Sequence, residues 1–474
     1  LRRRVRRMNF VANPLWRRRR TSSIVTLLAV AGIGLGSLIV GSADAGASPS
    51  VTLTVAYWSG FNPAGTNIMP AWISASAKEL QKTYPNVKVV GDEITTSSES
   101  EYYSKLDLTE RSARTAPDVV FEDSFLIGSD ASAGFLRPLP QLQTWSGWKS
   151  YYPAMKSSVS YNGKVYGAMN STDVQLVYYS HKLFKQAGLP ATWQPRSWAD
   201  VLSAARAIAR HDSGVVPLWI YTGQAVGEAS SFRGFEVFLN GTKDRLYDYT
   251  THKWEVSGPG FDATWKLLSQ MQPVEEPESM WSNPLADATV DLGLIPHQQV
   301  GIVFDGSWVP TAFVPGGLAP WPGFFSAYGE AAIPTQTGAA PGYTNQSGGW
   351  ALSVPSLASH PSLSQAFIEA ASSAPILASF DPASGNLPPR VDVIAQPAWQ
   401  ASVKVNPVSR FASAQLPYTT FRPNLPDYVL VSNVIQQLTG EISTRSITPS
   451  QAAASYASQV TQIVGSGNVV HMKQ

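Results

Sequence analysis

Apolar residues beyond position 50 follow first the period of a strand and then that of a helix. Residues 51–57 alternate between apolar and polar or small side chains, which predicts a strand. Apolar residues then recur at helical spacing over 73–84, and Pro85 ends that helix. Residues 87–90 and 118–121 predict the next strands. Strand–helix–strand order implies right-handed crossovers, so the pattern predicts an α/β fold with a parallel sheet covered by helices.

Two later segments carry helix-start signals. Ser197, with Asp200 three residues further on, predicts a helix that runs to about Arg210. Thr448 precedes a proline at the first helical position and predicts another helix near the end of the chain. One face of that helix is apolar and consists of Ala452, Tyr456, Val460 and Ile463. With 474 residues and no internal repeat, the chain is long enough for two or three domains.

Charge is divided unevenly along the chain. The formal net charge is +2, but residues 1–50 contain nine Arg and one acid, Asp44, so the remaining residues have a net charge of −6. An acidic body lacks the basic footprint of nucleic-acid-binding proteins, and we expect no nucleic-acid partner. The absence of cysteine excludes disulfides, thiolate metal sites, a cysteine nucleophile and a lipid-modified cysteine anchor.

The first 47 residues have the features of a secretory signal. Arg17–Arg20 precede the apolar stretch Ile24–Val40, and Ala43-Asp44-Ala45 fits the small-residue pattern of a signal peptidase site. The alternative is a permanent membrane anchor, since 17 apolar residues approach the length of a spanning helix. Three glycines in the stretch and the cleavage pattern favour a signal peptide at 1–47 and an exported protein, extracellular or associated with the cell envelope.

Motifs of common catalytic chemistry are missing from the sequence. It has no H-E-x-x-H, G-x-S-x-G, Walker or EF-hand pattern, and its six histidines are isolated from one another. We therefore expect no catalytic residues, no metal and no cofactor. The pattern favours a binding protein over an enzyme.

Seven motifs that occur in the same order identify a family. They are AYWSG at 56–60, APDVV at 116–120 with GFLRPL at 134–139, the stretch 161–205 with its GKVYG, YY, LFKQAGL and PATW elements, GSW at 306–308, GGW at 348–350, LPPR at 387–390, and RP at 422–423 with PDY at 426–428. In this order, over most of residues 51–465, they resemble the family 1 extracellular solute-binding proteins of ABC sugar importers, the group that includes maltose-binding protein.

The resemblance implies a two-lobed periplasmic-binding-protein-like fold of type II. Three chain crossings would form a hinge between the lobes and the ligand would lie in the interlobe cleft. By similarity, the first α/β lobe takes residues 48–170 plus 303–350, and the second takes 171–302 plus 351–474. The physical argument agrees, because ligands of open parallel sheets bind beyond the carboxyl ends of the strands, where Trp58 and Asp123 lie.

A sugar offers hydroxyl groups at its edges and C–H groups on its faces. Its site needs carboxylates or amides for the hydroxyls and aromatic rings under the faces. The tryptophans have a second interpretation, since packing in the core of a lobe is their usual role. The ligand-binding residues that we expect are Trp58, Asp123, Asn170, Asp173, Glu228, Trp308, Gly349, Trp350 and Arg390.

The predicted function is that of an ABC-transporter substrate-binding component. It would capture a carbohydrate, with a di- or oligosaccharide favoured because several tryptophans fall in predicted cleft loops, and deliver it to the membrane permease subunits as a monomer. One alternative is a secreted glycoside hydrolase that uses a pair among Asp123, Asp173, Glu228 and Asp305. The other is a binding protein for a non-sugar solute such as a polyol or a glycerol phosphodiester.

The signal segment leads to a first prediction. We expect the secreted protein to begin near Gly46 or Ser48, because both Ala43-Asp44-Ala45 and Ala45-Gly46-Ala47 fit the cleavage pattern. N-terminal sequencing of extracellular protein measures the start. Secreted protein that still carries residues before Ile24 would contradict cleavage and support an anchor.

Overall fold

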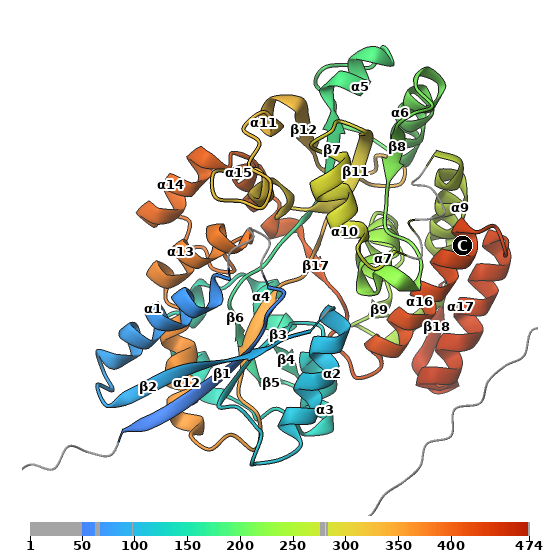
Figure 1. Cartoon of the computed structure of the whole chain (residues 1–474). Coiled ribbons are helices and arrows are strands. Elements are labelled where there is room, and N and C mark those ends of the chain that lie inside the picture. Colours follow the sequence, from blue (N-terminus) through green and yellow to red (C-terminus); the bar gives the residue numbers. More distant parts are fainter. Residues whose placement is uncertain (1–49, 62–66, 97, 275–279, 281–282, 473–474) are drawn as a thin grey trace, which may run out of the picture. The chain divides into compact units, whose positions relative to one another are not determined.

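The computed structural model describes residues 50–61, 67–96, 98–274, 280 and 283–472 (Figure 1). The described residues form one compact unit. The predicted signal peptide and its cleavage site lie outside the described residues. No helix in the described ranges has the length and apolar character needed to cross a membrane.

The first sheet has the strand order β2-β1-β3-β16-β6. Its strands are β1 (Val51–Trp58), β2 (Val87–Ile94), β3 (Val119–Asp123), β6 (Gly167–Met169) and β16 (Trp350–Ser353). β1 pairs in parallel with β2 and β3, whereas β16 is antiparallel to β3 and β6. Trp350 is in register with Asp123, so the start of β16 lies beside the end of β3.

Helices from distant parts of the sequence pack around this sheet (Figure 1). α1 packs on β2 and on α12, and α2 contacts β1 and β2. The helices of this region, in chain order, are α1 (Met69–Gln81), α2 (Glu99–Glu110), α3 (Ile127–Ala133), α4 (Pro153–Ser158), α12 (Pro361–Ala371), α13 (Ala374–Ser384), α14 (Pro397–Val405) and α15 (Val408–Ser413).

The second sheet has the order β12-β7-β11-β8. Its strands are β7 (Gln175–Ser180), β8 (Val216–Trp219), β11 (Val300–Gly306) and β12 (Tyr328–Ala331). Every residue of β7 and β11 is buried, as expected for central strands covered on both faces. The helices of this half are α5 (His181–Gln186), α6 (Trp198–His211), α7 (Glu228–Ser231), α8 (Val237–Leu239), α9 (Pro259–Met271), α10 (Ala286–Thr289), α11 (Phe324–Ala327), α16 (Tyr428–Ser443) and α17 (Pro449–Val464).

Shorter strands complete the description. A small sheet joins β18 (Val469–His471), β10 (Lys253–Ser257) and β9 (Tyr247–Asp248). Three strand pairs are β4 (Ser160–Tyr161) with β5 (Lys164–Val165), β13 (Ile333–Pro334) with β14 (Tyr343–Thr344), and β15 (Gln346–Ser347) with β17 (Thr420–Phe421).

The chain passes between the two sheets three times, at 170–174, at 345–349 and at about 419–427. Hydrogen bonds join these crossings directly. The side-chain amide of Asn345 pairs with both main-chain groups of Gln175, the residue that directly follows the first crossing, at 3.0 and 3.1 Å. The Gly348 N–H donates to Asp173 of the first crossing at 3.0 Å, and the Thr419 hydroxyl donates to the Ser347 hydroxyl at 2.6 Å. The three crossings therefore form one hydrogen-bonded bundle, which agrees with the predicted hinge.

The sheets divide the chain differently from the lobe boundaries that we expected. Residues 303–350 were assigned to the first lobe, but β11 and β12 pair with β7 in the second sheet. Residues 351–474 were assigned to the second lobe, but α12 packs on α1 beside the first sheet. Neither pairing could be predicted from the sequence, because β7 is more than 100 residues from β11 and β12, and α1 is more than 100 residues from α12.

The predicted elements agree closely with the structure. The Ser197 hydroxyl caps α6, and Thr448 forms a capping box with Gln451 at the start of α17. The first helix ends at Gln81 rather than near 84, and Tyr84 is exposed. On α17, Val464 is buried in place of the predicted Ile463, because the buried positions recur every four residues from Ala452 onward.

Candidate ligand-binding site

Asp123 is the last residue of β3 and lies at the carboxyl edge of the first sheet. Its carboxylate is buried, accepts a hydrogen bond from the Phe125 main chain at 3.3 Å, and forms an ion pair with Arg422 at 2.6 Å. Arg422 is 299 residues away in sequence and directly follows β17. The pair therefore connects the first sheet to the third crossing.

The Arg422 guanidinium is buried between two aromatic rings and two carboxylates. The Phe125 and Phe232 ring centroids lie 4.5 and 4.6 Å from it. Its second carboxylate partner is Glu228, at 3.4 Å. Ring faces carry negative charge density, so each of the four neighbours favours the cation.

Glu228 begins α7 and is half-buried. Its two oxygens accept hydrogen bonds from the Tyr428 hydroxyl at 2.5 Å and from the Ser432 hydroxyl at 2.6 Å, both on α16. Glu228 is therefore held from three directions, and α7, α16 and the third crossing meet at its carboxylate.

Asp173 lies in the first crossing and is buried. It accepts hydrogen bonds from the Gly348 main chain at 3.0 Å and from the Gln175 side chain at 3.1 Å. Burial raises the pKa of Asp173 to about 6, although the Gly348 hydrogen bond and the charge of Arg422 oppose this shift.

Asn170 lies three residues before Asp173 in the same crossing. Its main-chain N–H donates to the Trp350 carbonyl at 2.7 Å. Its side-chain amide is fully buried, and neither amide atom has a partner among the described residues. A buried amide without partners is costly, so this side chain needs a partner that the described residues do not supply.

Aromatic rings cluster at the edge of the first sheet. Trp350 stacks on Phe121 with a centroid distance of 4.9 Å and an interplanar angle of 8°, and it stacks on Trp58 at 6.1 Å. Trp350 is almost completely buried, whereas Trp58 and Tyr103 are half-buried. Of these three rings, Trp58 and Tyr103 therefore have accessible surface, and Trp350 packs against Trp58.

Gly349 is required by the packing of two crossings. Its φ angle of +139° is one that side-chain-bearing residues rarely adopt, and a Cβ atom at this position would lie 2.3 Å from the Ser171 carbonyl oxygen. Its own carbonyl accepts a hydrogen bond from Ser124 at 2.9 Å. Gly349 thus brings the backbone of the second crossing against the first crossing and the end of β3.

A second ion cluster is centred on Arg233. Its guanidinium binds Asp305 at 2.6 Å and Asp287 at 2.8 Å, and lies 3.9 Å from the Tyr221 ring centroid and 5.3 Å from that of Trp308. Charge from both aspartates raises the pKa of Arg233 well above its usual value against the opposing effect of burial. Trp308, two residues after the end of β11 and half-buried, lies against this cluster.

A π-helical turn connects the two clusters. Residues Phe232–Glu236 are π-helical between α7 and α8, and π turns are frequent at functional sites. Within this turn Phe232 contacts Arg422 while its neighbour Arg233 binds Asp305. Both arginines act electrostatically on Asp173, so both clusters lie near the first crossing.

The structure thus places most of the predicted site residues together. Contacts through Arg422 and the crossings join Asp123, Asp173, Glu228 and Gly349, and contacts through the rings join Trp58 and Trp350. Asn170 lies in the same first crossing, and Trp308 lies against the neighbouring Arg233 cluster.

Arg390 stands apart from this group. It binds Asp392 at 2.6 and 3.0 Å and the Ser372 carbonyl at 2.5 Å, next to the rings of Trp145 and Tyr151. In the described part of the chain, none of its contacts involves another predicted site residue.

Several residues of the site were missed by sequence analysis. Arg422 and Tyr428 belong to motifs that supported the family resemblance, but neither was assigned a role in binding. Tyr103 was missed because α2 was not predicted, although Ser98 and Glu101 have the spacing of a capping box and the Ser98 hydroxyl does accept from the Glu101 main chain at 3.2 Å.

Glu99 is a further acid at this site. Its carboxylate accepts from the Tyr103 hydroxyl at 2.6 Å. Burial, with the nearby charge of Asp123, raises the pKa of Glu99 to about 7.

Comparison with known proteins identifies the class. Residues 64–376, more than half of the chain, match the family described as bacterial extracellular solute-binding protein. The chain belongs to this family. No protein with a curated description matches the chain.

Solved structures share the fold. A Thermotoga lettingae ABC transporter solute-binding protein bound with α-D-tagatose has a TM-score of 0.69 and 21% identity, over 88% of this chain and 100% of that one. The GacH receptor of Streptomyces glaucescens, solved unliganded and with acarbose, has a TM-score of 0.70 and 19% identity, over 88% of this chain and 100% of that one. Maltose-bound MalE3 of T. maritima has a TM-score of 0.69 and 18% identity, over 88% of this chain and 100% of that one. The predicted two-lobed binding-protein fold is confirmed.

The Arg422 cluster leads to a prediction about stability. We expect Arg422→Gln to lower the free energy of unfolding by about 3–5 kcal/mol, because it leaves the carboxylates of Asp123 and Glu228 without their cation. Urea unfolding measures the loss. Arg410→Gln, which removes an exposed arginine, is the matched control. Adding Asp123→Asn to Arg422→Gln should restore part of the stability, and a loss below about 1 kcal/mol would contradict a buried pair.

Proposed function

We propose that this protein is the exported substrate-binding component of an ABC transporter that captures a neutral carbohydrate and delivers it to a membrane permease. The family match over residues 64–376 carries the proposal. The similar structures named above were solved with tagatose, acarbose and maltose, which makes a sugar the first class of ligand to test.

The composition of the site supports a sugar. Trp58, Tyr103 and Trp308 are half-buried rings suited to the C–H faces of a pyranose. Asp123, Asp173 and the unpartnered amide of Asn170 offer acceptors and donors for hydroxyl groups. More than one ring favours a di- or oligosaccharide over a monosaccharide.

The charge balance of the site argues against an anionic ligand. Both arginines that the structure describes there are already paired, Arg422 with Asp123 and Glu228, and Arg233 with Asp305 and Asp287. A glycerol phosphodiester would have to compete with these carboxylates for a cation. A neutral sugar has no such requirement.

A hydrolytic role has no specific support. A glycoside hydrolase needs one carboxyl group free to protonate the leaving group and a second one across the scissile bond. Asp123 and Glu228 share Arg422, and Asp305 is held by Arg233 and by the Tyr221 hydroxyl at 2.5 Å. These acids are engaged within the protein, which favours binding without turnover.

The function is tested with a ligand panel. We expect one class among malto-, xylo- and cello-oligosaccharides to raise the melting temperature, since ligand at about 100 times its dissociation constant adds roughly 2.7 kcal/mol to stability. The same sugars are analysed for cleavage after long incubation, and we expect them to be recovered intact. Cleavage products would contradict a transport role, and stabilisation by phosphodiesters instead of sugars would contradict the ligand class.

Two variants test the site. Asp123→Ala should weaken binding of the cognate sugar about 10- to 150-fold, because charge-assisted hydrogen bonds contribute roughly 1.5–3 kcal/mol, and Asp123→Asn should weaken it less. Trp308→Ala should also weaken binding, and Trp308→Phe should retain part of the affinity. Calorimetric titration measures each variant beside its melting curve without ligand. Affinity within threefold of wild type for both folded alanine variants would overturn this assignment.

A further inference from the structure

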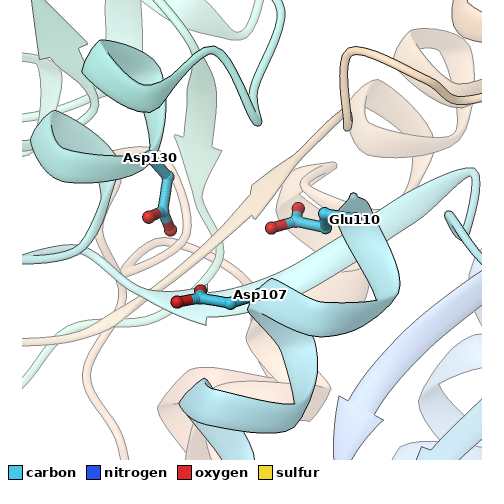
Figure 2. A group of neighbouring side chains, drawn as sticks. All are labelled: Asp107, Glu110 and Asp130. Carbon is cyan, nitrogen blue, oxygen red and sulfur yellow. The ribbon is translucent and has the colours of Figure 1, made fainter. Parts of the chain in front are cut away.

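Four carboxyl side chains meet at the end of α2, and none of them belongs to the ligand-binding site described above. Asp107 and Glu110 lie one turn apart on α2, and Asp130 comes from α3. One oxygen from each of these three lies within 4.8 Å of the others. Figure 2 shows the three carboxylates directed toward a common space.

Glu122, on β3, is the fourth acid and provides an independent observation. Its side chain is completely buried, and neither of its oxygens has a hydrogen-bond partner in the described part of the chain. It lies within hydrogen-bonding reach of the Asp130 carboxyl when one of the two carries a proton. Glu122 therefore lies against the same cluster from the sheet side, where the Asp130 carboxyl and the Ser353 hydroxyl are the protein groups nearest to its own carboxyl.

The described surroundings supply little compensating charge. Arg111, the cation that faces the cluster, is exposed and acts on Asp107. The Tyr102 hydroxyl is close to Glu110 and Glu122, but it donates its hydrogen bond to the Phe121 carbonyl and not to either acid. Burial raises the pKa of Glu110 to about 9 and that of Asp130 to about 7, and the neighbouring acids raise the pKa of Glu110 further. Such a group of acids must retain protons or bind a cation.

We propose that Asp107, Glu110, Asp130 and Glu122 form a calcium site. The donor set consists of carboxylate oxygens, which hard cations prefer, and carboxylates can bind Ca²⁺ through one or both oxygens. Oxygens that lie within 4.8 Å of one another can bind a single Ca²⁺ through bonds of about 2.3–2.6 Å, and Ca²⁺ accepts irregular coordination, whereas Mg²⁺ requires near-ideal octahedral geometry. Asp107 is half-buried, so water can reach the ion from its side and complete the coordination.

Calcium would join the end of α2 to α3 and β3. The same helix carries Glu99 and Tyr103 at its other end, beside the ligand-binding site. The calcium proposal nevertheless stands without the proposed sugar function, because the four acids and the sugar site share no residue.

The test uses the mature protein freed of metal with EGTA and then dialysed into chelator-free buffer. We expect calorimetric titration with CaCl₂ to show one Ca²⁺ per chain and the melting temperature to rise, with a smaller effect from MgCl₂. Titration extends to about 10 mM, above the dissociation constants of about 0.1–1 mM found in extracellular calcium modules.

Variants locate the site. Asp107→Asn, which changes a half-buried position and is expected to fold, and Glu110→Gln should each weaken Ca²⁺ binding at least tenfold. Glu79→Gln removes the same charge from another helix and should leave binding unchanged. If 10 mM CaCl₂ produces neither binding heat nor a rise in the melting temperature of the wild type, the proposal is overturned, and the acids are then neutralised by protons instead. Calcium binding that persists unchanged in Asp107→Asn would place the ion elsewhere and also overturn it.

Discussion

The buried carboxylate of Asp173 is the constraint around which the ligand-binding site is organised. It lies in the first of the three crossings and accepts the Gly348 N–H of the second, while the main-chain oxygen of Asp173 accepts the Ser347 hydroxyl. The Ser347 hydroxyl in turn accepts from Thr419 in the third crossing. Because buried polar groups need partners, moving one crossing breaks bonds in the other two. The hydrogen bonds therefore fix the three crossings relative to one another.

The arginines extend this constraint to both halves of the molecule. Arg422 comes from the third crossing and binds Asp123 at the edge of the first sheet and Glu228 at the start of α7. Arg233, five residues after Glu228, binds Asp305 in the second sheet. Each buried cation is matched by two carboxylates, so the site contains strong local fields with little unpaired positive charge. This balance suits a neutral polar ligand that exchanges hydrogen bonds with groups already in place.

The acids at the end of α2 show the opposite arrangement. Asp123 and Glu228 reach a buried arginine, but Glu110, Glu122 and Asp130 meet one another with no buried cation among the described residues. Removing water from like charges is costly, and a protein tolerates this only when protons or a metal ion neutralise them. The proposed calcium site is therefore the electrostatic counterpart of the arginine clusters.

Local patterns determined much of this protein before any tertiary contact was known. Alternating apolar residues predicted β1, and capping residues predicted the starts of α6 and α17, because these signals act between residues that are close in sequence. Ordered motifs identified the family, and Asp123, Asp173 and Trp350 were among the expected ligand-binding residues. Tertiary structure decided which distant residue or strand each of these residues and strands contacts. The Asp123–Arg422 pair spans 299 residues, the division of 303–350 depends on which strand β11 joins, and the acidic cluster brings α2, β3 and α3 together. No local pattern carries such information, because these contacts form only when distant segments pack on one sheet.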